Sequence, residues 1–245
     1  TSFMGKGFPN DKIIDVHSHD GNNWFATEQK VIKSDGNKYV SEKITFLNTN
    51  AKIQALLVDG DIEYFGTNQG LWSRQNDGEV KLIKNINVLI LSKTTNGEII
   101  VGSRKGLYSL SNETLKNMNP EGKDYSAISK TAVRDIEVIS ENEIWYATFG
   151  MGLFLENPET FTTINAKDGL DVGGMTFDLV KNGKKLFIAT KNGLYLYQNN
   201  KIEEHYTKND GLPSNVILDL DLDSNGNLWI ATASGLSKLS KSGFN

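Results

Sequence analysis

Residues 211–236 read GLPSNVILDLDLDSNGNLWIATASGL, and this stretch predicts two short β-strands and the start of a third. Val216–Leu222 is apolar at alternate positions, and Asp223–Gly226 after it has the chemistry of a turn. Leu228–Thr232 is a second β-rich run, and Ala233–Gly235 turns the chain again. No helical periodicity of useful length appears, so the stretch predicts a β-meander.

The same phrase recurs along the chain: a short apolar strand ends in a hydroxyl residue, and a glycine follows three or four residues later. A degenerate first copy, Trp24–Thr27, has Lys30 where the others have the glycine. The hydroxyl residues, spaced 40, 36, 45, 42 and 42 positions apart, are Thr27, Thr67, Ser103, Thr148, Thr190 and Thr232. Six copies of a unit of roughly forty residues predict a repeat architecture.

Composition narrows the classes of function. The 245 residues carry a formal net charge of −4, so no basic surface for nucleic acid is predicted. Apolar runs such as Val88–Leu91 are far too short to span a membrane, and this segment is not expected to be membrane-embedded. The absence of cysteine excludes disulfides and thiolate catalysis. No sequence feature indicates a cofactor.

Four strands in each of six repeats predict an all-β, six-bladed β-propeller that forms a single domain. The predicted repeats span residues 12–47, 51–82, 86–118, 131–164, 174–207 and 215–245. Residues 7–10 resemble residues 211–214, which indicates that the N-terminus is the end of a repeat, and the last repeat runs out after Leu239 without a fourth strand. We therefore expect Thr1–Met4 to pair as the outer strand beside Leu236–Leu239 and to close the ring.

The phrase Gly211–Asn215, continued through Gly226–Thr232 and Gly235-Leu236, resembles the two-component regulator propeller repeat. The likeness is strongest in the sixth repeat, good in the fifth and fourth, and weaker toward the first. That family is best known from periplasmic sensor regions of hybrid histidine kinases in Bacteroidetes-type bacteria, many of which detect glycans. The resemblance implies a propeller fold, a periplasmic or cell-surface location and a sensor role in a bacterial two-component system.

The turns of a propeller blade alternate between the two faces of the disc. The Asp-Gly and Asn-Gly hairpin turns lie on one face, and the Thr-x-x-Gly turns and the connectors between repeats lie on the other. We call the second face the connector face. Its longer and more varied loops make it the better candidate for binding.

The fourth repeat combines the longest connector, residues 117–131, with an enlarged turn at residues 149–152. An aromatic platform beside charged groups suits a glycan or a peptide-like ligand. Loop drift would explain the two insertions equally well. The predicted ligand-binding residues on these and the neighbouring connectors are Tyr125, Phe149, Met151, Asp168, Asp171, Lys208 and Asp210.

Four aspartates, Asp15, Asp135, Asp178 and Asp219, fall at equivalent positions of the first strand in repeats one, four, five and six. Repeats two and three have Ala55 and Ile90 there. First strands line the central channel of a propeller. These carboxylates therefore either form a lopsided acidic ring that binds a cation, water or sugar hydroxyls, or accept hydrogen bonds from neighbouring backbone amides. The second interpretation is favoured.

Other chemically active residues have simple structural interpretations. His17 and His19 lie on one face of a strand but lack a third ligand at convincing spacing, so no metal site is predicted. Trp24, Trp145 and Trp229 share one repeat position and are predicted to lie in the blade core.

The sequence shows no nucleophile–base–orienter constellation, which argues against an enzyme. It predicts a non-enzymatic recognition propeller, an extracytoplasmic sensor-type domain for a glycan or peptide-like ligand. One alternative is an interaction scaffold that binds another protein of the envelope or of a secretion system, and a second is a propeller hydrolase or lyase. A concave pocket near the axis would favour a small-ligand sensor, and a flat exposed patch would favour a scaffold.

Overall fold

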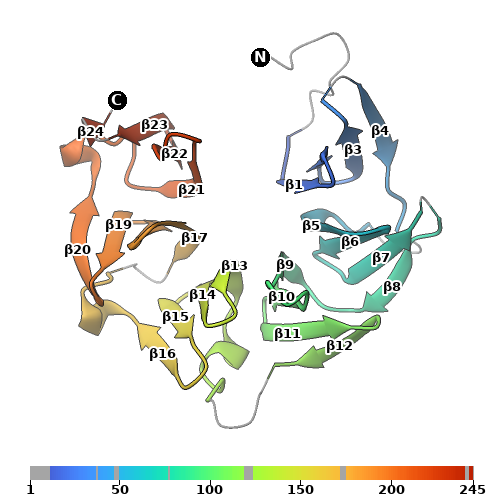
Figure 1. Cartoon of the computed structure of the whole chain (residues 1–245), viewed down its shortest axis with the longest axis horizontal. Coiled ribbons are helices and arrows are strands. Elements are labelled where there is room, and N and C mark those ends of the chain that lie inside the picture. The colour runs from blue at the N-terminus through green and yellow to red at the C-terminus, as the bar shows by residue number, and fades with distance from the viewer. Residues whose placement is uncertain are drawn as a thin grey trace.

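The structure, a computed structural model, describes residues 12–36, 38–46, 50–76, 78–118, 124–171, 175–240 and 243–244. The described strands form six four-stranded antiparallel sheets, or blades, around a common axis (Figure 1). The strands of every blade pair in sequence order, so each blade is a meander. The predicted all-β, six-bladed propeller is confirmed.

The strands of each blade run from the axis outward in chain order. Blade 1 holds β1 (Asp15–His19), β2 (Asn22–Ala26), β3 (Lys30–Ser34) and β4 (Tyr39–Lys43). Blade 2 holds β5 (Ile53–Asp59), β6 (Ile62–Thr67), β7 (Leu71–Gln75) and β8 (Lys81–Lys84). Blade 3 holds β9 (Val88–Lys93), β10 (Ile99–Ser103), β11 (Gly106–Ser111) and β12 (Thr114–Asn117).

The second half of the chain repeats this arrangement. Blade 4 holds β13 (Val133–Ser140), β14 (Glu143–Thr148), β15 (Leu153–Glu156) and β16 (Phe161–Ile164). Blade 5 holds β17 (Thr176–Asn182), β18 (Lys185–Thr190), β19 (Gly193–Gln198) and β20 (Lys201–Tyr206). Blade 6 holds β21 (Ile217–Leu222), β22 (Leu228–Thr232), β23 (Gly235–Ser240) and β24 (Gly243–Phe244). Three short 3-10 turns on connectors are η1 (Ile128–Lys130), η2 (Ala166–Asp168) and η3 (Lys208–Asp210).

A hydroxyl side chain closes the turn between the second and third strands of every blade. In blade 5, Thr190 Oγ1 donates to the carbonyl oxygen of Gly193 at 2.7 Å and accepts from the N–H of Asn192 at 3.0 Å. The six hydroxyl residues are buried at the ends of their strands, so this bond gives each hydroxyl a partner in place of water. The same bond to the carbonyl oxygen three or four residues on is made by Thr27, Thr67, Ser103, Thr148 and Thr232.

The core lies between the blades. Alternate residues of a strand point to opposite faces of its sheet, and each face packs on a neighbouring blade. Five clusters of buried side chains result, one for each pair of consecutive blades. Between blades 5 and 6, for example, Phe187 and Leu194 meet Leu228 and Ile230. The consecutive inner strands β1, β5, β9, β13, β17 and β21 also contact one another in that order.

The last blade takes its outer strand from its own sequence. β24 pairs with the end of β23, with Leu239 opposite Phe244 and Ser240 opposite Gly243. The expectation that the sixth repeat lacks a fourth strand is therefore wrong, because a strand of two residues is too short to show an alternating pattern. The predicted partner, Thr1–Met4, lies outside the described residues.

Of the three tryptophans that share one repeat position, two lie in the blade core. Trp24 and Trp145 are 5% and 3% exposed, as predicted, and each packs against the blade that follows it. Trp229 is 38% exposed, so its predicted place in the blade core is wrong. The next blade buries this position, and blade 6 is the last of the described blades.

Two equivalent glycines offer a matched test of the turn geometry. Gly193 and Gly235 occupy the same turn position of blades 5 and 6, with φ values of 132° and 143°. A Cβ on Gly193 would lie 2.4 Å from the carbonyl oxygen of Tyr206. On Gly235 the nearest atom would be Cβ of Pro213, at 3.9 Å.

We predict that Gly193→Ala lowers the free energy of unfolding by about 3 kcal/mol or more, and Gly235→Ala by about 1–2 kcal/mol. Both variants share the unfavourable backbone conformation, and only the first adds a clash with backbone. Urea unfolding midpoints measure both. Equal losses in the two variants would contradict this account of the turn.

Candidate functional site

Three carboxylates of the inner strands each bind the blade that follows. In each case the carboxylate accepts a hydrogen bond from a backbone N–H. Asp15 accepts from Leu56 at 2.7 Å, Asp135 from Leu179 at 2.9 Å, and Asp178 from Leu220 at 2.6 Å. The three leucines occupy one repeat position, so a single bond is repeated at three blade–blade contacts. For these three aspartates the favoured interpretation, hydrogen bonding to backbone amides, is confirmed. Asp219, the fourth, is exposed in blade 6.

The channel wall raises the pKa of its carboxyl groups. Burial is the largest cause for all four aspartates. The pKa of Asp178 lies well above its usual range because of burial and then because of the charges of Asp135 and Asp219. Glu137 accepts the N–H of Lys181 at 3.3 Å, and burial followed by the charge of Asp135 raises its pKa to about 7. Among the described residues no group of three or more acidic, His or Cys side chains is placed to hold a metal ion.

A pocket of about 390 Å³ opens beside these strands at the axis. Four of its residues stand one position before the channel aspartate or its replacement in blades 1 to 4, namely Ile14, Gln54, Leu89 and Arg134. Glu28 and Asn68 belong to turns between second and third strands, which places the pocket on the connector face. We call it the axial pocket. Lys52 and Ile53 complete its lining.

Arg134 is the distinctive charge of the axial pocket. Its guanidinium carbon lies 5.5 Å from the centre of the Phe177 ring, a cation–π contact that orients the side chain. Burial lowers the pKa of Arg134, and the charge of nearby Arg104 lowers it further. Lys52 pairs with Glu28 at 2.7 Å, whereas no ion pair of Arg134 occurs within the described part of the chain. The pocket thus presents a guanidinium group to an incoming anion.

The sequence contained a signal for Arg134 that the sequence analysis missed. The position before the channel aspartate carries one residue from every blade, and these residues ring the axis. In the other blades they are uncharged: Ile14, Gln54, Leu89, Phe177 and Leu218. Arg134 is thus the one charged residue among the six at this position, and packing does not require a charge there.

The predicted aromatic platform is only partly present. Tyr125 is 1% exposed and stacks on Phe161, with 4.2 Å between ring centres, inside the core between blades 3 and 4. Its predicted role as an exposed ligand contact is wrong, because the long connector turns inward through η1 and buries the ring. Phe149 and Met151 are 49% and 42% exposed, so their ligand-binding role remains a prediction.

The predicted charged residues lie on the neighbouring connectors, where two of them cap 3-10 turns. Asp168 accepts the N–H of Asn165 at 2.9 Å. Asp210 accepts both the N–H and the hydroxyl of Thr207 at 2.8 Å, and these bonds lower its pKa. Asp171 and Lys208 are exposed. The structure therefore gives Asp168 and Asp210 a local structural role. Ligand binding by these four charged residues remains a prediction.

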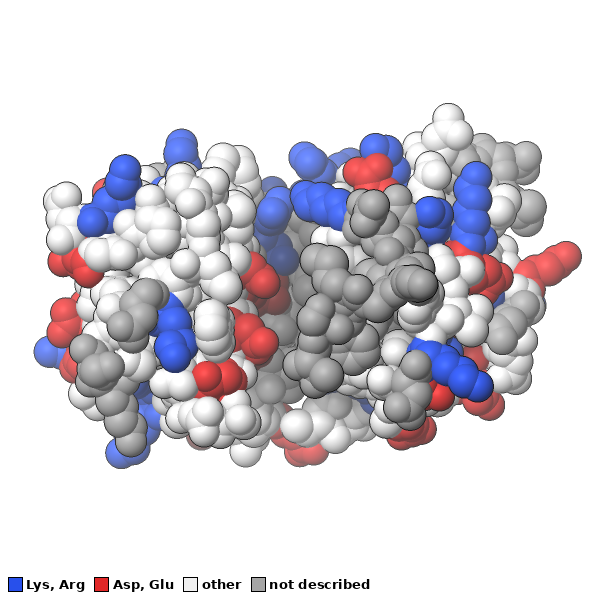
Figure 2. Space-filling view, turned by 90° about the horizontal axis from the view of Figure 1, so that it is seen from above, with Lys and Arg blue, Asp and Glu red and all other residues white. Residues whose placement is uncertain are grey.

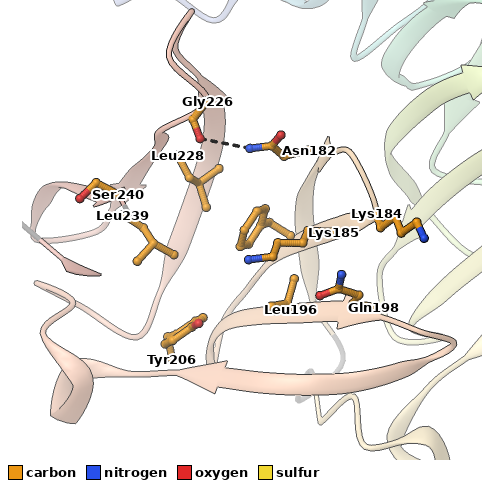
Figure 3. A pocket seen from close by; sticks show the side chains of 11 residues that line it. Asn182, Lys184, Lys185, Leu196, Gln198, Tyr206, Gly226, Leu228, Leu239 and Ser240 are labelled. Atoms are coloured by element: carbon orange, nitrogen blue, oxygen red, sulfur yellow. Dashed lines mark hydrogen bonds between the residues drawn. The ribbon is translucent and has the colours of Figure 1, made fainter. Parts of the chain in front are cut away.

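A larger cavity, of about 680 Å³, lies between blades 5 and 6 (Figure 3). Asn182 Nδ2 donates to the carbonyl oxygen of Gly226 across it at 3.1 Å, and the amine of Lys185 points inward while Lys184 points away. Core side chains form much of its wall, among them Phe187, Leu196, Leu228 and Leu239. None of the predicted ligand residues lines the cavity.

Comparison with known proteins agrees with the propeller fold. The family model described as two component regulator propeller matches residues 211–234. The predicted resemblance is confirmed. The extracellular domain of a putative hybrid two component system from B. thetaiotaomicron superposes on the propeller with a TM-score of 0.73 and 19% identity, over 97% of this chain and 33% of that chain. A second structure of that domain, described as a putative one component system, gives 0.74 at the same identity and coverage. The chain thus spans a third of the length of these neighbours.

The same fold also occurs in enzymes. A catalytically inactive virginiamycin B lyase from Staphylococcus aureus, with quinupristin, has a TM-score of 0.69 and 13% identity, over 94% of this chain and 82% of that chain. Identities of this size show the fold alone. No curated protein matches the sequence. Within the described residues, no helix has the length and apolar character needed to cross a membrane.

The raised carboxyl pKa values predict that stability falls as pH rises. A carboxyl group whose pKa is higher in the folded state binds more protons there than in the unfolded chain, so its contribution is complete below the unfolded value and is lost through the folded one. For Glu137 that window runs from its usual 4.5 to about 7. We expect Glu137→Gln to be more stable than the parent protein at pH 8 by about 1–2 kcal/mol, and to lose this advantage at pH 4.5.

Thermal unfolding at both pH values measures this difference. Asp221→Asn, which changes an exposed carboxyl of β21, is the control and should show no comparable pH-dependent gain. A Glu137→Gln gain that is equal at the two pH values would contradict the titration of this group.

Proposed function

We propose that the chain is a non-enzymatic recognition propeller of the sensor type, which binds an anionic extracytoplasmic ligand in the axial pocket. The observation that carries the proposal is Arg134, exposed in a concave pocket at the axis and held by Phe177 without a described acidic partner. A concave site favours a small ligand over a flat protein partner.

The residues that line the pocket favour a ligand with both an acidic group and an apolar face. An arginine guanidinium recognises a carboxylate or sulfate with two parallel hydrogen bonds. Ile14 and Leu89 add apolar contact area beside it. Gln54 Nε2 donates to Asn87 Oδ1 at 3.0 Å and to the carbonyl oxygen of Val88 at 2.8 Å, so its position is fixed. An acidic sugar unit offers both a carboxylate and an apolar ring face, and we propose an oligosaccharide that contains uronic acid.

The comparisons with known proteins support the proposed sensor role and location. The matching repeat family and the neighbours from B. thetaiotaomicron, whose domains are described as extracellular, support a periplasmic or cell-surface domain of a bacterial signalling protein. A lyase is the alternative, because lyases share the fold. Against it, Asp15, Asp135 and Asp178 are engaged by backbone amides that join blades, so these carboxylates serve the fold.

The test is calorimetric titration with uronic acid oligosaccharides and with neutral oligosaccharides of equal length. We expect binding of the acidic series only, and a loss of roughly 10- to 100-fold in affinity in Arg134→Ala, since one charged hydrogen-bonded contact is removed. Arg134→Lys should recover part of the affinity because it keeps the charge but not the planar fork. Lys184→Ala, which removes one positive charge at a distant exposed position, is the matched control and should bind as the parent does.

Three results would contradict the proposal. Equal affinity of Arg134→Ala and the parent protein would exclude the axial pocket. Loss of affinity in Phe149→Ala but not in Arg134→Ala would place the ligand at the enlarged turn of the fourth repeat, as predicted from the sequence. Cleavage of the oligosaccharide during the titration would make the protein an enzyme.

A further inference from the structure

The cavity of about 680 Å³ between blades 5 and 6 combines a buried apolar wall with an open polar end. Phe187 and Leu196 of blade 5 and Leu228 of blade 6 form the apolar wall and are 5%, 5% and 2% exposed. Lys185 and Gly226, near the hairpin turns, are exposed, so the cavity reaches solvent there. We call it the interblade cavity. Its size falls within the range of small-molecule sites, about 300–1,000 Å³.

The preceding interface shows how the fold fills this space elsewhere. Between blades 4 and 5, Trp145 packs edge-on against Tyr197, with 5.2 Å between the ring centres. Strand register puts Phe187 at the position of Trp145 and Leu239 at the position of Tyr197. Both replacements are smaller, and both line the interblade cavity. The cavity therefore lies where two larger rings pack at the interface before it.

The two interfaces also differ in charge. Glu143 of blade 4 forms an ion pair with Lys181 of blade 5. Register makes Lys185 the equivalent of Glu143 and Leu222 the equivalent of Lys181 at the next interface. Leu222 packs against the core between blades 5 and 6. An acid and a base are thus replaced by a single cation whose partner position is aliphatic.

No acidic group within the described part of the chain compensates this cation. The amine of Lys185 points into the cavity, while the neighbouring Lys184 points away (Figure 3). Among the described residues the Lys185 amine has no ion pair, and none of those that line the cavity is acidic. Figure 2, which views the molecule from the side of blades 1 and 6, shows uncharged surface over much of blade 6. The interblade cavity thus presents one ammonium group beside aromatic and aliphatic side chains.

We infer that the interblade cavity is a second ligand-binding site, and that its ligand is a small aromatic carboxylate. The ring of the ligand lies against Phe187 and Tyr206, the two aromatic residues of the lining, which favour edge-on or offset contacts with another ring. Its carboxylate pairs with Lys185. Such a ligand supplies both the ring volume and the negative charge that the preceding interface has and this one lacks. The cavity lies apart from Arg134, so the inference does not depend on the ligand proposed for the axial pocket.

The experiment is an NMR titration of the full chain with three probes that share an indole ring. Indole-3-acetate carries a carboxylate, tryptophol is neutral, and tryptamine carries an amine. We expect indole-3-acetate to shift the backbone amide signals of Phe187 and Leu228. Tryptophol and tryptamine should bind roughly tenfold more weakly or less, because each lacks the charged contact with the lysine.

Four variants separate the charge from the cavity. Lys185→Ala should lower the affinity for indole-3-acetate roughly tenfold and leave that for tryptophol unchanged, whereas Lys185→Arg should keep most of it. Lys184→Ala, which removes the adjacent charge that points away, is the matched control and should bind as the parent does. Leu239→Tyr should fill the cavity and abolish binding without lowering the unfolding temperature, because blade 5 accommodates Tyr197 at the same position.

Three outcomes overturn the inference. If indole-3-acetate at millimolar concentration shifts no amide around the cavity, the cavity is not a site for this class of ligand. Equal affinities for indole-3-acetate and tryptophol would remove the role of Lys185. If octanoate binds as tightly as indole-3-acetate, the site does not select an aromatic ring.

Discussion

The contact between consecutive blades is the constraint on which the rest of the structure depends. A four-stranded meander exposes two faces, and in this chain both carry apolar residues, so no blade is complete without neighbours. Burial of these faces stabilises the ring at roughly 25 cal/mol per Å² of apolar surface. The contact also sets side-chain size. Gly66 and Gly102 occupy a position that is alanine in the other blades, and a Cβ there would lie 2.5 Å from Val88 and 2.4 Å from Ile90.

Several charged side chains at these interfaces are held by hydrogen bonds or ion pairs. The channel aspartates receive backbone amides, and between blades 1 and 2 the guanidinium of Arg74, 4% exposed, binds Glu42 at 2.7 Å and Glu63 at 2.5 Å. A buried charge without such partners would cost several kcal/mol. Burial, and after it the like charges of neighbouring carboxylates, nevertheless raises the pKa values of Glu137 and Asp178 and links the stability of the ring to pH. The inner strands therefore combine cohesion between blades with an electrostatic penalty at the axis.

The sequence predicted the fold well because every blade repeats the same solutions. The hydroxyl turn and alternating strands recur at nearly constant spacing, and each copy reinforces the assignment of the others. The errors fall where a residue's environment comes from distant sequence. Tyr125 sits in a long connector and looked exposed, but the connector folds onto Phe161. Trp229 was assigned to the core by analogy with Trp24 and Trp145, although its burial depends on a blade that does not follow it in the described structure.

The candidate site lies where packing between blades constrains the residue type least. The residue before the channel aspartate lies outside the buried core in most blades, although Phe177 packs against the cluster between blades 5 and 6. Packing therefore constrains the chemistry of this position less than that of the buried positions. Arg134 is charged at this position, while its equivalents are aliphatic, aromatic or amide. Loop length alone points instead to the connectors, where Asp168 and Asp210 cap their own turns. A comparison of residue chemistry at each repeat position would instead have singled out Arg134, because a repeat fold leaves function to those positions that packing does not constrain.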